Sequence, residues 1–395
     1  KMLHDTFFDE AVYRVSPLSL SHAHAHVCNM IPASLLKSAP WAWNCQSPLP
    51  YGYILPKSKK DWTTARSIIA YASSPIGVGL RAAALALAEI TKQVYPDSFD
   101  QNAVHIFRQL HAFFHECDAA LRLSYVNDDL VGFFTSIPQD RILDAVTAAI
   151  DQYIEKQSKT QHVSWDSTLS IQILESQFPG HVFRGRNTSK VLSLSDVRDI
   201  VQLSFRANLF VALGTVFAQV RGSTIGNQIS PIISSLTVCV QEQAWKQCYS
   251  EFLFANQQSF RFFRYVDNRF IIFETAVART PALSSLLDEW FYQQPVQLEV
   301  VPDDHFLGFT VDVRLREIRY MFPTHQWQFR VPNSAGSKGQ LMAGFLSRAS
   351  LISNRTFPHS CVHSDLTRLV QCYGQQGFQE HLLWKALRLK PHNQG

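Results

Sequence analysis

The chain carries, at residues 262–273, the sequence Phe-Phe-Arg-Tyr-Val-Asp-Asn-Arg-Phe-Ile-Ile-Phe. Aromatic and β-branched residues on both sides of Asp267-Asn268 are typical of strands, and the Asp-Asn pair is typical of a turn. The pattern predicts two strand halves over residues 260–273 that meet at this pair. A half-buried aspartate between hydrophobic strands is costly unless it is paired with a charge or bound to a metal ion.

A second aspartate ends an earlier strand in the same way. Asp129 begins the sequence Asp-Leu-Val-Gly-Phe-Phe-Thr-Ser-Ile (129–137), and an apolar strand over residues 121–134 is expected to run into a turn here. Two acids from adjacent strands can hold two Mg²⁺ ions about 3.5–4 Å apart. Each aspartate taken alone is more simply interpreted as a turn residue. The surrounding motifs therefore decide whether the two aspartates are interpreted as metal ligands.

Three further motifs lie around these acids. Residues 222–231, Gly-Ser-Thr-Ile-Gly-Asn-Gln-Ile-Ser-Pro, read as a glycine loop that enters a helix, because glycine permits positive φ and close approach while Ser-Pro suits a helix start. Residues 306–309, Phe-Leu-Gly-Phe, follow the second aspartate. Upstream, Lys57, Lys60 and Arg66 supply cations suited to phosphate oxygens.

In this order and at these gaps the motifs resemble those of reverse transcriptases, and over residues 50–385 they are most similar to the Penelope-like element branch related to telomerase. The resemblance implies that Asp129, Asp267 and Asn268 are catalytic, and that Asp129 and Asp267 bind the metal ions. It implies that Phe134 excludes a 2′-hydroxyl and that Phe306, Leu307 and Gly308 grip the primer. The remaining nucleotide-binding residues that it implies are Lys57, Lys60, Arg66, Gly222, Gly226 and Gln228.

The sequence departs from the family pattern at the third motif, Tyr-x-Asp-Asp. Asn268 replaces the second aspartate, so a negative charge is lost and metal affinity is expected to fall. Arg269 follows directly and is expected to lower the local negative charge further. No lysine corresponds to the family's general acid, and His305, which lies nearby, is interpreted as structural.

The composition is compatible with a polymerase but does not by itself indicate one. The chain has 395 residues, 46% hydrophobic and 17% charged, with a net charge of +4, which fits a globular protein with two or three lobes. Seven scattered cysteines indicate a reduced intracellular compartment, the nucleus in a eukaryote. No transmembrane helix is expected. Because the chain starts at Lys1, we expect it to be part of a longer protein.

We expect an α+β fold, a right-hand polymerase with fingers, a palm built on a ferredoxin-like antiparallel sheet, and a helical thumb. Residues 1–45 are an unassigned lead-in, 46–320 form fingers and palm, and 321–395 form the thumb. The histidines of residues 22–28 are interpreted as a strand face or an irregular segment. One helix is expected from Ser193 through Phe217, and another over 283–291.

The expected activity is RNA-directed DNA polymerisation by a retroelement (a retrotransposon), with Mg²⁺, or Mn²⁺ as an alternative ion, and with an RNA template, a DNA primer and dNTPs as partners. Two alternatives stay open. One is a telomerase-like enzyme that uses a dedicated RNA. The other is a domesticated scaffold that binds RNA without polymerising, which the residue at Asn268 favours.

Overall fold

The computed structural model describes residues 6–56, 65–96, 102–161, 170–174, 189–301, 303–322, 331–333 and 336–388. The chain forms two compact units, each built from several stretches of sequence. The first unit comprises residues 1–99, 130–248 and 289–297, and the second comprises residues 100–129, 249–288 and 298–395.

A five-stranded sheet lies in the first unit, with the strand order β1-β8-β7-β2-β3. Tight hairpin chemistry explains part of this order, because Leu213 and Gly214 between β7 and β8 both have positive φ, as a two-residue hairpin turn requires. The strands are β1 (Tyr13–Val15), β2 (Tyr51–Pro56), β3 (Ala65–Ala70), β7 (Leu209–Ala212) and β8 (Thr215–Gln219).

Four long helices pack on one another in the same unit: α4, α6, α7 and α8. Apolar residues at helical spacing on α4, among them Leu80, Leu87 and Ile90, are fully buried and drive this packing. The helices of the unit are α2 (Leu20–Asn29), α3 (Ala33–Ser38), η1 (Pro40–Ala42), α4 (Gly77–Val94), α6 (Gln139–Gln161), α7 (Leu194–Arg206) and α8 (Ser230–Cys248). A separate hairpin is formed by β5 (Ser170–Leu174) and β6 (Ser189–Ser193).

Two expectations for this unit are wrong. The histidine-rich segment forms helix α2, because the Ser19 side chain accepts a hydrogen bond from the His22 amide and Ala23 and Val27 are buried one turn apart. The helix that begins after Ser193 ends at Arg206 instead of running through Phe217. The residues that follow are rich in β-branched and aromatic side chains and form the hairpin β7–β8.

The second unit contains a four-stranded sheet with the order β11-β4-β10-β9. Its strands are β4 (Leu123–Val131), β9 (Phe260–Tyr265), β10 (Asn268–Glu274) and β11 (Gln297–Val300). β10 is central and antiparallel to both β4 and β9. The two strand halves predicted around Asp267-Asn268 are therefore confirmed, and so is the strand predicted before Asp129.

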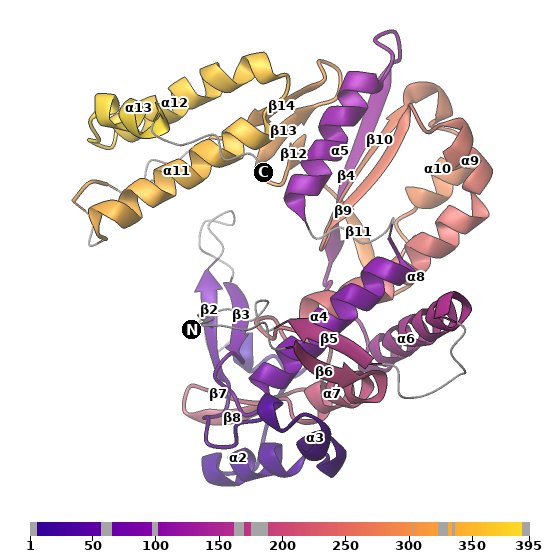
Figure 1. The fold of residues 1–395 in the computed structure, drawn as a ribbon, viewed down its shortest axis with the longest axis vertical. Helices are drawn as coiled ribbons and strands as arrows, with labels where there is room; N and C mark the ends of the chain where they lie inside the picture. The colour runs from indigo at the N-terminus through magenta and orange to yellow at the C-terminus, as the bar shows by residue number, and fades with distance from the viewer. Residues whose placement is uncertain are drawn as a thin grey trace. The chain divides into compact units, whose positions relative to one another are not determined.

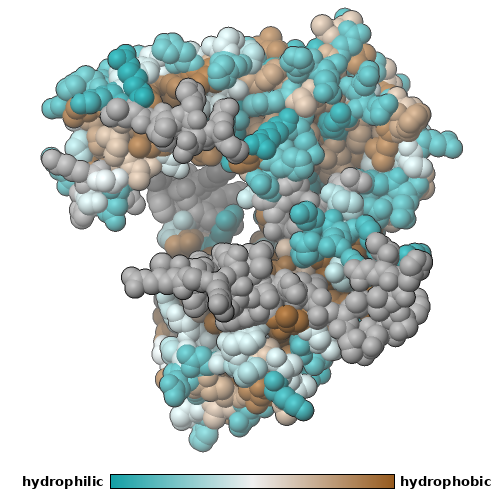
Figure 2. Space-filling model, in the orientation of Figure 1, coloured by the Kyte–Doolittle hydropathy of each residue, from teal (hydrophilic) through white to brown (hydrophobic). Residues whose placement is uncertain are grey.

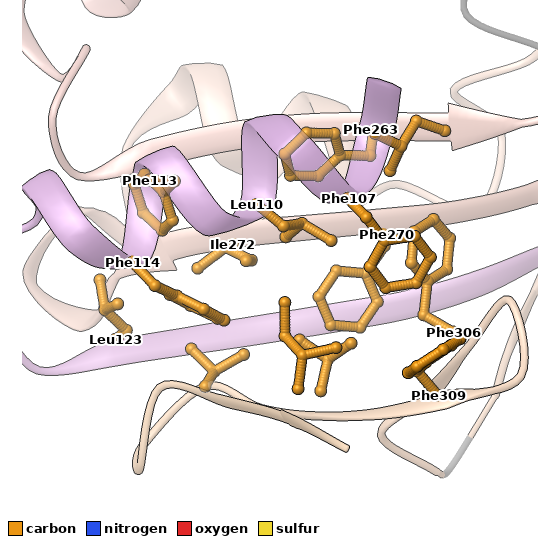
Figure 3. Close-up of a cluster of buried hydrophobic side chains, with 14 of the residues drawn as sticks. Phe107, Leu110, Phe113, Phe114, Leu123, Phe263, Phe270, Ile272, Phe306 and Phe309 are labelled. Atoms are coloured by element: carbon orange, nitrogen blue, oxygen red, sulfur yellow. The ribbon is translucent and has the colours of Figure 1, made fainter. Parts of the chain in front are cut away.

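Helix α5 (Ala103–Glu116) covers this sheet and closes a hydrophobic core, which Figure 3 shows. Phe107, Leu110 and Phe113 point from the helix toward the sheet, and Phe270 points back from β10. The ring of Phe270 stacks on Phe306 with centroids 5.0 Å apart. The core thus joins the catalytic-motif strands to the segment that follows them.

The rest of the second unit is a small sheet with helices. The strands are β12 (His305–Phe306), β13 (Phe309–Asp312) and β14 (Glu317–Tyr320). Helices α11 (Lys338–Arg355), α12 (Val362–Gly374) and α13 (Glu380–Arg388) share an apolar core around Phe345 and Leu369. The remaining helices are α9 (Ser250–Ala255), η4 (Thr275–Val277), α10 (Pro281–Leu286) and η6 (His359–Cys361), so the helix expected over 283–291 is shorter.

The surface of the second unit is mostly hydrophilic on the face drawn in Figure 2, with small hydrophobic patches between. Among the described residues no helix combines the length and apolar character that crossing a bilayer requires.

The packing of Phe270 gives a stability prediction. Its side chain is 0% exposed, so Phe270→Ala should lower the free energy of unfolding by about 3–5 kcal/mol. Phe254, in α9 of the same unit, is 78% exposed, and Phe254→Ala should have little effect. Urea unfolding of the two variants checks this, and equal losses would contradict the assignment of Phe270 to the core.

Candidate active site

The turn between β9 and β10 presents Asp267. Tyr265 and Asn268 are opposed across the hairpin, so Val266 and Asp267 form a two-residue turn. Val266 has φ of +57°, a conformation that a β-branched residue rarely adopts. Its carbonyl oxygen accepts a hydrogen bond of 2.9 Å from Nη1 of Arg264. The turn is thus held in a fixed, strained form that projects the aspartate from the sheet.

The neighbouring strand brings the second acid to the same place. In the antiparallel pair of β10 and β4, Asn268 lies directly opposite Asp129. Opposed Cα atoms in such a pair are about 4.5–5.5 Å apart, and Asp267 is the residue immediately before Asn268. Both aspartates are half-buried. The two acids that the sequence predicts as metal ligands are therefore brought together.

The other side of the same strand pair carries a buried ion pair. Arg269 lies opposite Asp128, and its Nε donates to Oδ2 of Asp128 at 3.0 Å while Nη1 donates to the Leu286 carbonyl at 2.8 Å. The side chains are 0% and 3% exposed. Successive strand residues face opposite sides, so this pair lies behind Asp129 and Asn268.

Arg269 is expected to lower the local negative charge, and the structure pairs it with Asp128 on the reverse face. The pair neutralises the carboxylate of the residue that precedes Asp129. The sequence interpretation missed Asp128 altogether. No local signal identifies it, because the pairing of Asp128 with Arg269 depends on the register of two strands that are far apart in the sequence.

The hairpin β12–β13 turns at Leu307 and Gly308, both with positive φ. Phe306 and Phe309 on either side are buried in the core described above. Of the three residues expected to grip a primer, only the turn residues Leu307 and Gly308 lie at the surface of this hairpin, half-buried and exposed respectively. Phe306 instead anchors the hairpin to β10.

Acidic side chains gather just before β12. His305 lies within ion-pair distance of Asp303 and Asp304, with nitrogen–oxygen separations of 3.6 and 3.8 Å. Tyr125 on β4 is near them, and burial, followed by the negative charges of Asp304, Asp312 and Asp303, raises its pKa. The phenol therefore stays neutral at physiological pH. The interpretation of His305 as a structural residue agrees with these contacts.

In the first unit, the glycine loop contacts the segment that holds Phe134. The Ser223 amide donates to the Phe134 carbonyl at 2.7 Å. Gly222 has φ of +69°, and a Cβ there would lie 2.4 Å from the same carbonyl oxygen. Glycine is required here because two segments of the chain touch. The structure thus brings Phe134 and Gly222 together.

The second glycine of the loop packs on strand β3. Gly226 has φ of +102°, and a Cβ there would lie 2.5 Å from the carbonyl oxygen of Ile69. Arg66, on the same strand, is exposed. Gln228 is half-buried, and its Oε1 has no hydrogen-bond partner in the described part of the chain. Lys57 and Lys60 lie outside the described residues.

Asp129 and Asp267 are the residues best placed to hold a divalent cation, since carboxylate oxygens suit Mg²⁺ and Mn²⁺. Among the residues whose positions are described, no three His, Cys, Asp or Glu side chains gather in a way that could hold a metal ion. A bound ion would thus take its remaining oxygens from water and a phosphate substrate, as Mg²⁺ commonly does.

Known polymerase structures resemble this chain in fold. No family model matches the chain, and no curated protein matches it in sequence. The structure is similar to telomerase from Candida albicans in complex with a TWJ fragment of telomeric RNA, with a TM-score of 0.56 and 11% identity over 86% of this chain and 58% of that one. This chain has the fold of a right-hand polymerase. The predicted fold class is confirmed.

Two structures of telomerase from Candida tropicalis are also similar, each with a TM-score of 0.50 over 86% of this chain. The RNA complex is 10% identical and covered over 56% of its length, and the apo form is 9% identical and covered over 60%. The chain thus spans less than two thirds of these telomerases. The assignment of fingers, palm and thumb to residue ranges stays a prediction for this polymerase fold.

The buried ion pair gives a prediction with a definite sign. Arg269→Met leaves Asp128 buried and unpaired and should cost about 3–5 kcal/mol of unfolding free energy. Adding Asp128→Leu to that variant should recover much of the loss, because a hydrophobic pair replaces the charges. Lys159→Met, which breaks the exposed pair with Glu155, should leave stability unchanged. A double variant no more stable than Arg269→Met would contradict this account.

The close approach of the chain at Gly222 gives a further stability prediction. Gly222→Ala and Gly214→Ala both place alanine at positive φ, which costs roughly 1–2 kcal/mol, but a Cβ at Gly214 meets nothing within 4 Å. Gly222→Ala should therefore lose roughly a further 1–3 kcal/mol through overpacking. Thermal unfolding of the two variants measures the difference, and equal losses would rule out the contact with the Phe134 segment.

Proposed function

We propose that this protein is an RNA-directed DNA polymerase of a retroelement, which transfers nucleotides from dNTPs to a primer 3′-hydroxyl. The observation that carries the proposal is the pairing of β4 with β10, which sets Asp129 opposite the residue that follows Asp267. The right-hand polymerase fold supports the proposal. A fold alone does not establish an activity, so the arrangement of the site has to agree with it.

In this proposal Asp129 and Asp267 hold two Mg²⁺ ions, or Mn²⁺ in their place. Such ions neutralise the triphosphate and favour ionisation of the attacking hydroxyl. The aspartates contribute negative charge at one end of the two central strands, where the strained turn at Val266 keeps Asp267 in one conformation. Pre-organised charges of this kind cost no rearrangement during the reaction.

The other residues take the roles that the resemblance implies. Phe134 selects deoxynucleotides, and its backbone is held by the loop at Gly222. The turn at Leu307 and Gly308 contacts the primer. The remaining proposed contacts, to the triphosphate and to the template–nucleotide pair, are Lys57, Lys60, Arg66, Gly226 and Gln228. The RNA template, the DNA primer and an intracellular, nuclear location belong to this proposal.

A telomerase-like enzyme with a dedicated RNA is the second candidate. The similarity to telomerases of two Candida species favours it. A scaffold that binds RNA without polymerising is the third, and Asn268 is the residue that favours it. The three candidates differ in what they require. The retroelement polymerase needs dNTPs and any primed RNA, the telomerase-like enzyme needs one particular RNA, and the scaffold needs no dNTP.

Primer extension on a generic RNA template separates these candidates. With Mg²⁺ and dNTPs, the purified chain should extend a DNA primer, and Asp267→Ala or Asp129→Ala should reduce the rate by about 10²–10³-fold, because several kcal/mol of transition-state stabilisation is lost. Asp144→Ala removes an exposed carboxylate from α6 and should leave the rate unchanged.

The outcomes of this assay distinguish the three candidate functions. Extension that survives Asp267→Ala would overturn the proposed site. Extension only after addition of one specific RNA would support the telomerase-like enzyme. RNA binding without extension, in Mg²⁺ and in Mn²⁺, would support the scaffold.

A further inference from the structure

The amide of Asn268 has specific partners on β4. Its Nδ2 lies 3.4 Å from Oδ1 of Asn127 and 3.3 Å from the Asp128 carbonyl oxygen. Both partners are hydrogen-bond acceptors, so position 268 must supply a donor. A carboxylate has only acceptor oxygens when ionised. The residue that departs from the family's Tyr-x-Asp-Asp motif is therefore the one that its surroundings require.

Asn127 leaves no ambiguity about which of its atoms faces Asn268. It is buried, and its Nδ2 donates 3.0 Å bonds to the carbonyl oxygens of both Asp303 and His305. An amide nitrogen has two hydrogens, so both are used. The remaining atom, Oδ1, can only accept, and it points at Asn268.

These contacts form one chain of hydrogen bonds across three segments. Residues 303–305 are bonded to Asn127, and Asn127 is bonded to Asn268. The Asn127 carbonyl also accepts from the Val301 amide at 2.7 Å. Asn268 in turn sits opposite Asp129 and next to Asp267. The chain ties the catalytic turn to the start of β12.

We infer that Asn268 is a positioning residue, whose amide nitrogen fixes the turn that carries Asp267. This inference rests on the proposed polymerase function. It reverses the expectation from the family pattern, in which asparagine here is a weakened metal ligand. An aspartate at position 268 would replace this nitrogen with an oxygen that faces the Asn127 Oδ1 and the Asp128 carbonyl, two acceptors.

The test is to install the family's aspartate. Asn268→Asp should lower the thermal midpoint by about 2–4 °C and reduce kcat for primer extension about tenfold, with the KM for dNTP unchanged. The Mg²⁺ concentration for half-maximal rate should not fall. Asn333→Asp, at an exposed position of the same unit, adds the same charge elsewhere and should change none of these values.

An Asn268→Asp variant that is faster than the native protein, or that needs less Mg²⁺, would overturn the inference, because residue 268 would then act as a ligand. A lower midpoint with kcat unchanged, measured well below the unfolding temperature, would overturn the positioning role and leave a structural one.

A second measurement does not depend on activity. Asn127→Ala and Asn268→Ala should be less than additive in unfolding, because each removes the same bond. If the native chain extends no primer, the polymerase proposal fails, and this cycle together with the Asn268→Asp midpoint still judges the amide pair. Additive losses would overturn the pairing in either case.

Discussion

The arrangement of the candidate site depends on a buried ion pair that takes no part in the chemistry. Arg269 and Asp128 are both enclosed, and an ion removed from water is tolerated only with a partner and further hydrogen bonds, which the Leu286 carbonyl helps to supply. The pair therefore allows one alignment of β10 with β4. A slip of one residue would separate the charges and would turn Asp129 to the other side of the sheet.

Strand alternation then divides one short stretch of sequence between two tasks. On β4, Asn127 and Asp129 share a face, and Asp128 lies on the other. The face with Asp129 continues into the aromatic core under α5, where Phe270 stacks on Phe306. The active face is thus rigid along its length, because the same strands that carry the acids also build the core of the unit. Preorganised carboxylates require such support.

Local signals explain what the sequence could predict. The strand pair around Asp267 and the strand before Asp129 were predictable, since β-branched and aromatic residues flank each acid. The partner of Arg269 was not, because it depends on register between segments about 140 residues apart. Gly222 was predicted to allow positive φ, which it has, and close approach, but the group that approaches it is the Phe134 segment of the chain itself. Helix α7 ends at Arg206 because strand pairing of the next residues outweighs helical periodicity.

The turn at Val266 shows how these constraints meet at Asp267, the proposed metal ligand. A valine at φ of +57° is unfavourable by itself, and such strain persists only where the surroundings determine the backbone more strongly than the residue does. Here two strands with fixed register enter the turn, and Arg264 holds the Val266 carbonyl. Because both ends of the turn are fixed, the backbone of Asp267 stays next to the residue that lies opposite Asp129. In the proposed function, two aspartates placed on adjacent strands would offer divalent cations the carboxylate oxygens that two-metal nucleotidyl transfer requires.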